Sequence, residues 1–283
     1  MQGYITLATG SRFYLDLAMN LVLSLKLNDP SRPVCVVTDR AMAIPESYRP
    51  FIDHIAFMDA KPGFHGCLNK LRMNEVSPFD ESMFVDSDCI LLKKDMDRQW
   101  AKLQGPGFSS PGTRLTTGRW YGFEIADVIK TLGIDYMCSL NSGVFYFRQG
   151  TEADRFFATA LDLVEHHKEL LGSFHRNKLQ LADEPFIGAA LGKLKIPTVG
   201  YVPEEGSIQI TTIRATGIRF DPFTQTSQVT RYDNYRLLGR FFPRTRVQHS
   251  PSFAHFVKLK PEPVYQRISD QLREHFGLPK FMI

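Results

Sequence analysis

The chain has 283 residues, a formal net charge of +4 at pH 7, 43% hydrophobic residues and 12% aromatic residues. The charge is modest and spread along the chain, which argues against a dedicated nucleic-acid surface but is compatible with a locally basic cleft for an anionic ligand. No apolar run approaches the ~20 residues of a membrane span, and no basic segment followed by an apolar helix opens the chain. The length suits one large α/β domain or two small ones.

The four cysteines lie far apart and form no Cys-x-x-Cys pair. They are Cys35, Cys67, Cys89 and Cys138, of which Cys35 and Cys89 fall inside apolar, strand-like runs. This usage is typical of reduced, packed thiols rather than of a disulfide framework or a zinc site. We therefore expect a soluble, cytoplasmic protein.

The first forty residues predict a βαβ unit. Residues 4–8 and 33–38 are buried, β-rich runs, and the apolar residues within 15–25 recur with helical spacing. The crossover should be right-handed and the two strands parallel. Ligands bind beyond the carboxyl ends of such strands, so we expect residues 9–12 and Thr38 to lie at the same edge of the sheet.

A third apolar run at residues 54–58 is followed by a loop at 61–66 and by a short helix at 68–76. This helix carries Lys70 and immediately precedes the next strand. Lys70 is thereby a candidate to return to the ligand edge and neutralise phosphate. The alternative is that it faces water, as most lysines on short helices do.

The next strand, at residues 83–85, ends in Asp86-Ser87-Asp88 before the chain resumes with the apolar residues 89–92. A nearly continuous apolar run is typical of an interior strand, where Asp is rare. Residues i and i+2 of an extended chain point the same way, so Asp86 and Asp88 can aim their oxygens at one point. This arrangement suits a hard divalent cation that also holds phosphate oxygens. The alternative is a polar strand end that leads into a turn.

Residues 105–117 are rich in Gly, Pro, Ser and Thr, which predicts a loop, and a helix is expected at 123–132. The segment 141–143, Asn-Ser-Gly, then precedes a strongly β-prone run at 144–147. Asn and Gly at the entrance to a strand predict a tight turn. The alternative is a polar group presented to a bound sugar.

Residues 152–171 predict a long amphipathic helix that ends at Gly172. Further on, Asp183 is a good helix N-cap, and Pro185 suits an early helical position. The functional alternative is that one acid of the Asp183-Glu184 pair faces the cleft and contacts a substrate hydroxyl.

Beyond Pro203, short β-prone pieces at 208–213 and 218–220 indicate a smaller substrate-binding part. A strand-like piece at 253–257 contains His255, and a terminal helix follows Pro261. Basic residues are more frequent after residue 230. They predict a solvated face or, alternatively, contact with a membrane or an acidic acceptor, and they are Arg231, Arg236, Arg240, Arg244, Arg246, Lys258 and Lys260.

Six features of the chain, in this order, resemble the GT-A fold nucleotide-sugar glycosyltransferases. They are the βαβ unit, Lys70, the Asp-x-Asp strand, the Asn-Ser-Gly segment, the helix start at Asp183, and His255 followed by Lys-Pro. They look most like glycosyltransferase family 8, which includes glycogenin and the bacterial lipopolysaccharide glycosyltransferases, over residues 3–261. The resemblance implies a Rossmann-like, mostly parallel central sheet flanked by helices in a single domain, 1–283. Residues 1–100 would bind the nucleotide-sugar and the metal, 101–260 would bind the sugar and the acceptor, and 261–283 would form a C-terminal helix.

The same resemblance implies roles for individual residues. Asp86, Asp88 and His255 would bind Mn²⁺ or Mg²⁺, and Asn141 and Asp183 would meet the transferred sugar as catalytic residues. Phe13 or Tyr14 would stack on the base. The residues implied to contact the nucleotide-sugar donor are Ala8, Thr9, Tyr14, Thr38, Lys70, Asp86, Ser87, Glu184, Lys258 and Lys260.

The chain departs from the pattern of the family at two places. The late motif, residues 255–261, is one residue short and lacks the Gly and the Trp that follow the histidine in the family. Asp183-Glu184 stands where many relatives have Asp-Gln. These departures leave open the roles of His255 and Lys260, the identity of the donor and the retention of anomeric configuration.

The resemblance and the residues together predict a metal-dependent glycosyltransferase that moves a hexose from a nucleotide-diphosphate sugar, with a UDP-sugar as the expected donor, to a hydroxyl of a glycan, lipid-linked or protein acceptor. A cation and nearby lysines would stabilise the departing diphosphate. The alternatives are a phosphohydrolase, which would need its acids near the first strand, a nucleotidyltransferase, which would need a Gly-rich loop there, and a non-catalytic sugar-binding module.

Overall fold

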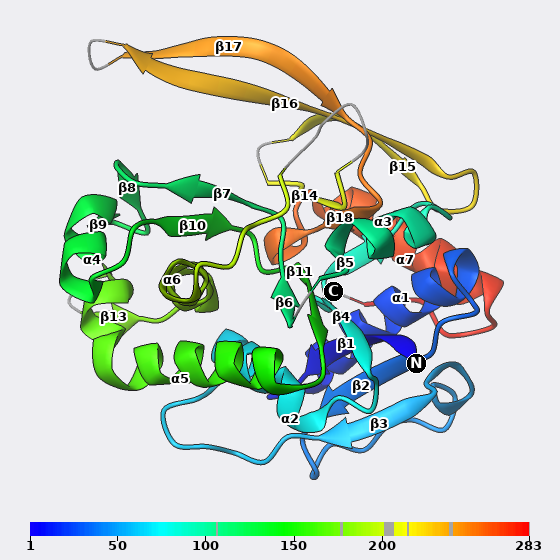
Figure 1. Ribbon diagram of the computed structural model, residues 1–283. Helices are drawn as coiled ribbons and strands as arrows, with labels where there is room; N and C mark the ends of the chain where they lie inside the picture. Colours follow the sequence, from blue (N-terminus) through cyan, green and yellow to red (C-terminus); the bar gives the residue numbers. More distant parts are fainter. Residues whose placement is uncertain (106, 176–177, 201–206, 214, 238–239, 283) are drawn as a thin grey trace.

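The computed structural model describes residues 1–105, 107–175, 178–200, 207–213, 215–237 and 240–282. Its centre is a six-stranded sheet in the order β3-β2-β1-β4-β11-β6 (Figure 1). The strands are β1 (Gln2–Ala8), β2 (Val34–Thr38), β3 (His54–Phe57), β4 (Glu81–Val85), β6 (Phe108–Ser109) and β11 (Val144–Arg148). The pairs β1–β2, β2–β3 and β1–β4 are parallel, and β11 runs antiparallel to β4 and β6. The expected α/β fold with a mostly parallel central sheet is confirmed.

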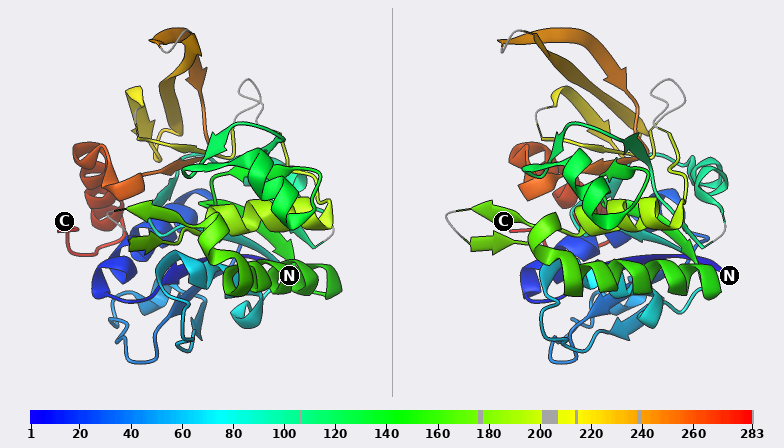
Figure 2. Two further views of the ribbon diagram at one scale, coloured as in Figure 1. Left: turned by 90° about the vertical axis from the view of Figure 1, so that its left-hand side faces the viewer. Right: turned by 60° about the vertical axis from the view of Figure 1, so that its left-hand side comes forward.

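The two faces of this sheet carry separate hydrophobic cores. Tyr4 and Val36 belong to one cluster, together with apolar residues of α1 (Arg12–Asn28) and α7 (Glu262–His275). Ile5 and Val37, one residue further along, belong to the other, together with α5 (Thr151–Leu171) and α6 (Asp183–Leu194). Alternate residues of a strand point to opposite faces. The near-continuous apolar runs of β1, β2 and β4 therefore follow from helices that cover both sides (Figure 2).

The remaining elements form smaller pieces around this sheet. The antiparallel pair β7 (Gly112–Leu115) and β10 (Met137–Leu140) lies beside α6, and β14 (Gln209–Thr211), β18 (Phe253–His255) and β5 (Cys89–Leu91) form a three-stranded sheet. A ribbon of β15 (Thr216–Asp221), β16 (Thr226–Leu237) and β17 (Arg240–His249) projects from the body in Figures 1 and 2. The other elements are α2 (Met73–Val76), α3 (Met96–Leu103), α4 (Ile125–Leu132), β8 (Arg119–Trp120), β9 (Phe123–Glu124), β12 (Ser173–His175), β13 (Lys178–Gln180) and the 3₁₀ helices η1 (Arg49–Phe51), η2 (Gly66–Arg72) and η4 (Val257–Leu259).

The βαβ unit is confirmed as β1, α1 and β2, whereas the prediction of a loop over 105–117 is wrong in part. That segment contains β6 and β7. The ring of Phe108 stacks on Phe156, with 3.6 Å between centroids, and pairing with β11 extends the central sheet. Tertiary packing thus overrides a loop-like composition. No helix among the described residues is long and apolar enough to cross a membrane.

Candidate functional site

A tight turn and a late strand bring the carboxylates and the histidine together. The Asp86 N–H donates to Gly143 O at 2.8 Å, and the Cys89 N–H donates to Asp86 O at 2.9 Å. Strand β5 then pairs antiparallel with β18, so that Cys89 lies opposite His255. The convergence of the acids was expected from an extended strand, but a turn at the end of β4 produces it.

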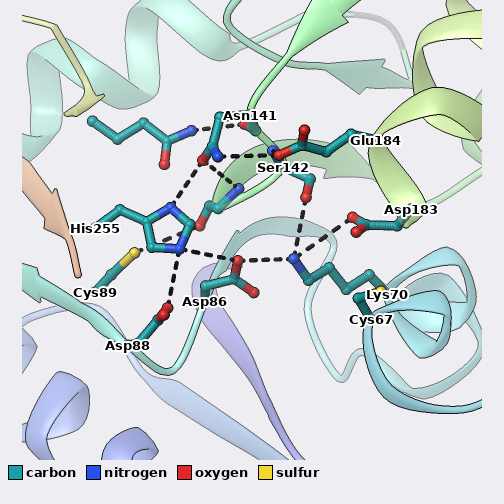
Figure 3. A network of polar contacts seen from close by, with 12 residues as sticks. Cys67, Lys70, Asp86, Asp88, Cys89, Asn141, Ser142, Asp183, Glu184 and His255 are labelled. Carbon is teal, nitrogen blue, oxygen red and sulfur yellow. Dashed lines mark hydrogen bonds and ion pairs between the residues drawn. The ribbon is translucent and has the colours of Figure 1, made fainter. Parts of the chain in front are cut away.

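Both acids approach the same nitrogen of the imidazole. His255 Nε2 lies 3.1 Å from Asp88 Oδ1 and 3.6 Å from Asp86 Oδ2 (Figure 3). Burial lowers the pKa of His255, but the carboxylates of Asp88 and Asp86 outweigh it, and the pKa is raised above its ordinary value. Burial raises the pKa of Asp86 against the opposing effect of Lys70. Two carboxylates thus converge on one imidazole nitrogen, and the positive charge of a protonated His255 is stabilised there.

The ammonium group of Lys70 lies inside this site, not in water. Its Nζ donates to Asp86 Oδ2 at 2.8 Å and to Ser142 Oγ at 3.1 Å, and it lies 3.6 Å from Asp183 Oδ2. Burial lowers the pKa of Lys70, but Asp183 and Asp86 raise it well above its ordinary value. Lys70 thus stays charged, and Figure 3 shows it pointing from η2 toward both acids.

The Asn-Ser-Gly segment connects the imidazole to α6. Asn141 Nδ2 donates to Glu184 Oε1 at 3.1 Å, so Asn141 Oδ1 is the acceptor that faces His255 Nδ1 at 2.9 Å. Nδ1–H of the imidazole therefore donates to Asn141 Oδ1, and Nε2 faces the carboxylates, to which it donates when it is protonated. Loss of the Nε2 proton would leave the lone pair of this nitrogen free for a cation. The imidazole is thereby oriented as a metal ligand would be.

Glu184 holds this segment in place with both of its oxygens. Oε1 also accepts the N–H of Ser142 at 3.3 Å, and Oε2 accepts the hydroxyl of Tyr121 at 2.8 Å. Burial raises the pKa of Glu184 in spite of these donors. Asp183 is the first residue of α6 and makes no capping hydrogen bond, so its predicted N-cap role is wrong. Its carboxylate faces Lys70 instead.

Gly143 allows these side chains to meet. A Cβ on this residue would lie 2.5 Å from His255 Nδ1, 2.6 Å from Gln209 Oε1 and 2.8 Å from Asn141 Oδ1. Contacts this short do not occur in folded proteins, so a side chain here would displace the imidazole or the amides. The glycine serves close approach as well as the predicted turn.

Comparison with known proteins finds matches among solved structures but not among sequences. No protein-family model and no curated protein matches the sequence. Among solved structures, the galactosyltransferase LgtC in complex with donor and acceptor sugar analogues superposes with a TM-score of 0.50 at 15% identity, over 76% of this chain and 77% of that chain. An active-site mutant of LgtC gives 0.51 at 16% identity, over 76% of each chain. The chain has the GT-A glycosyltransferase fold.

A third solved structure, the glycosyltransferase GlyE of Streptococcus pneumoniae, gives a TM-score of 0.46 at 12% identity, over 74% of this chain and 48% of that chain. The two LgtC structures define the fold. The chemistry of the site in this chain is therefore inferred from the residues of this chain.

The donor set on this GT-A scaffold fits a hard divalent cation. Asp88, Cys89 and His255 offer atoms that all lie within 4.8 Å of one another, and Asp86 Oδ2 adds a second carboxylate oxygen. Burial raises the pKa of the Cys89 thiol well above its ordinary value, and a thiol is a soft ligand that suits a hard ion less well than carboxylate oxygens do. Two carboxylates and one imidazole suit Mn²⁺, and the carboxylates suit Mg²⁺.

A cavity of about 250 Å³ lies at the carboxyl ends of β1 and β4, beside this donor set. It is the edge that the βαβ unit predicted. Of the residues expected to contact a donor, those that line it are Thr9, Tyr14, Lys70, Asp86 and Ser87. Ala8 and Thr38 do not line it; both are buried, and Thr38 Oγ1 donates to Ala8 O at 3.1 Å.

Lys258 and Lys260 are not brought to this cavity. Both are exposed, and Lys260 Nζ lies 3.3 Å from Glu262 Oε2. Lys258 has a φ of +55°, a left-handed conformation that L-residues rarely adopt. It occupies the position three residues after His255 at which the resembling family has glycine.

Sequence reasoning missed Tyr121 and Gln209. Tyr121 lies between Gly118 and Gly122, both with positive φ, in a turn that delivers its hydroxyl to Glu184. Gln209 donates through Nε2 to Asn141 O at 2.8 Å. The two glycines signalled a special turn around Tyr121. A single Gln on a short strand carries no comparable signal.

Proposed function

We propose that this protein is a metal-dependent glycosyltransferase that moves a hexose from a nucleotide-diphosphate sugar, with a UDP-sugar as donor, to an acceptor hydroxyl with retention of configuration. The observation that carries the proposal is the convergence of Asp86, Asp88 and His255 beside the buried Lys70, at the ligand-binding edge of a GT-A sheet.

The site suits the stabilisation of a departing diphosphate. Asp86, Asp88 and His255 would hold Mn²⁺ or Mg²⁺, which supplies Lewis-acid neutralisation of phosphate charge when bound. Lys70 adds a cation whose position is already fixed by Asp86, Ser142 and Asp183. A charge pair at ~4 Å contributes ~4 kcal/mol at an effective dielectric constant of ~20, so this lysine alone can lower the barrier substantially.

Asp183 would act on the transferred sugar. Its carboxylate is buried at the start of α6, and its Oδ2 accepts no hydrogen bond among the described residues while facing Lys70. A carboxylate with free acceptor capacity can take a hydrogen bond from a sugar hydroxyl and stabilise the positive charge that develops at the anomeric carbon. In the retaining reaction the acceptor hydroxyl arrives on the face that the diphosphate leaves.

Asn141 and Glu184 would contribute by positioning. Asn141 fixes the tautomer of His255, and Glu184 fixes Asn141 and Ser142. Because both oxygens of Glu184 already accept from protein donors, we assign it to the support of the donor site rather than to a direct nucleophilic role. Donor contacts of Lys258 and Lys260 rest on the sequence resemblance alone.

The late arginines support a peripheral contact with an anionic membrane or acceptor. Arg236, Arg240, Arg244 and Arg246 lie on β16 and β17, in the ribbon that projects from the body (Figure 1). Segments of the sequence that are rich in Arg and Lys are attracted to anionic lipid. Sedimentation with vesicles tests this contact, and equal binding to neutral and anionic vesicles would exclude it.

Titration of UDP-sugars with and without Mn²⁺ tests the proposed reaction, together with a screen for metal-dependent release of UDP. We expect binding that needs the metal, and we expect Asp88→Ala to abolish that dependence because it removes the carboxylate nearest His255 Nε2. Asp127→Ala, at an exposed position on α4, is the matched control.

Unchanged metal-dependent binding by the Asp88→Ala variant would contradict the proposal. The same screen separates the alternatives. Release of phosphate from sugar phosphates without use of UDP-sugars would indicate a phosphohydrolase, formation of a nucleotide-sugar from a sugar phosphate would indicate a nucleotidyltransferase, and binding without turnover would indicate a sugar-binding module.

A further inference from the structure

A second cavity, of about 460 Å³, lies between the β7–β10 pair, β14 and the strands β16 and β17. Four residues with hydroxyl-bearing side chains, Thr113, Ser139, Ser207 and Thr211, belong to its lining, as does Arg231. None of the lining residues, all of which the structure describes, is acidic. The cavity therefore combines one permanent positive charge with several groups that can hydrogen-bond to sugar hydroxyls.

Arg231 differs from those arginines of the described structure that are paired with an acid. Arg32, Arg148 and Arg273 each contact a carboxylate. Arg231 is half-buried on β16, where its backbone pairs with Val247, and its guanidinium has no hydrogen-bond or ion-pair partner among the described residues. A partly buried guanidinium without an anion is costly, and phosphate or carboxylate is the group that its planar fork binds best.

Asn141 connects this cavity to the proposed metal site. Its carbonyl accepts the side-chain amide of Gln209, and both residues line the cavity. Its side chain contacts His255 Nδ1 at 2.9 Å. A ligand in the cavity is thus separated from the imidazole by a single residue, which places it next to the donor rather than on a remote surface.

We propose that this cavity binds an anionic group, a phosphate or a carboxylate, carried by the acceptor saccharide. Arg231 takes the charge, and the surrounding hydroxyls take the sugar. This inference rests on the proposed glycosyltransferase function. It adds that the acceptor is an acidic or phosphorylated glycan rather than a neutral one.

Calorimetric titration of the full chain, with Mn²⁺ and UDP present, tests the binding directly. The ligands are a neutral hexose, the matching hexuronic acid, the matching hexose phosphate and inorganic phosphate. We expect the better of the two anionic sugars to bind about 10- to 100-fold more tightly than the neutral hexose, as a charge-assisted contact provides. The stronger of the two arms identifies the anion.

Variants locate the effect. Arg231→Ala should remove the preference for the anionic sugar, and Arg231→Lys should keep part of it because charge remains but the bidentate geometry is lost. Thr113→Glu, at an exposed position of the same cavity, should repel anionic sugars more than neutral ones. Arg219→Ala is the control, because Arg219 is exposed on β15 and does not line the cavity.

Equal affinities for the four ligands, or a preference that survives in Arg231→Ala, would overturn the inference. Inorganic phosphate that binds as tightly as the hexose phosphate would show that no saccharide is recognised and would overturn it as well. Release of UDP from a UDP-sugar without acceptor tests the proposed function separately. If UDP is released but the protein shows no preference for anionic sugars, this inference alone is refuted. If the protein prefers anionic sugars but releases no UDP, both the acceptor role of the cavity and the proposed function are refuted.

Discussion

Lys70 and Lys260 are both nominated by the sequence to meet a diphosphate, yet they lie in opposite settings. The side chain of Lys70 is 9% exposed and contacts two carboxylates and a hydroxyl. The side chain of Lys260 is 60% exposed and contacts Glu262, two residues along the chain. The first charge is held in position before any ligand arrives, whereas the second would have to be recruited. A positive charge contributes to a site in proportion to how firmly the fold holds it.

The largest effect should come from removing the buried charge. Lys70→Met leaves Asp86 and Asp183 without their cation, and breaking a buried pair in this way costs about 3–5 kcal/mol. We expect that loss in the free energy of unfolding, measured with urea, and a fall in the rate of metal-dependent UDP release of about 10²- to 10³-fold.

Lys260→Met is the matched comparison and should change the free energy of unfolding by less than about 0.5 kcal/mol, as exposed ion pairs do. Equal effects of the two substitutions, in stability and in rate, would break the distinction between the two lysines.

A smaller effect is expected from crowding the imidazole without removing any charge. Gly143→Ala places a methyl group within 2.5–2.8 Å of His255, Gln209 and Asn141 and should displace the ligand nitrogen. Mutation of a group that orients a metal ligand typically lowers metal affinity about 10- to 100-fold. Titration with Mn²⁺ measures this loss. Gly200→Ala is the control, since a Cβ there meets no atom of the described residues within 4 Å. An unchanged Mn²⁺ affinity in Gly143→Ala would show that the imidazole is not a ligand.

The smallest effect is expected from a substitution at Lys258, which tests whether the late lysines take part in donor binding. Lys258→Gly relieves a left-handed backbone conformation and should raise the free energy of unfolding by about 0.5–1 kcal/mol. If the ammonium of Lys258 has no part in donor binding, the affinity for the UDP-sugar will not change. A weaker affinity in a more stable variant would instead assign Lys258 to the diphosphate and narrow the contrast with Lys70.

The sequence predicts the residues at the carboxyl ends of β1 and β4 (the first half of the site) better than those around the start of α6 and after β18 (the second half). The reason is physical. Parallel strands end at one edge, so the positions of Thr9 and Asp86 follow from strand order once the βαβ unit is recognised. Lys70 was a candidate because of its place just before β4, and the family resemblance rather than the local pattern assigned it to the site. The inferences for Thr9 and Asp86 need only local patterns and the rule that ligands bind at the carboxyl edge.

The second half depends on contacts between distant residues, which leave little trace in one sequence. The N-cap role expected for Asp183 is wrong because Lys70, from a separate element, attracts its carboxylate. Tyr121 reaches Glu184 through a turn whose geometry composition does not specify. The direction of Lys260 depends on a neighbouring acid, which its motif could not indicate.

The pairing of β5 with β18 has a consequence for the order in which the molecule matures. Asp86 and Asp88 are synthesised some 170 residues before His255, which lies on β18. A nascent polypeptide in which β18 has not yet been made lacks the imidazole, however well its central sheet has formed. The proposed cation site is therefore complete only once β18 has joined β5.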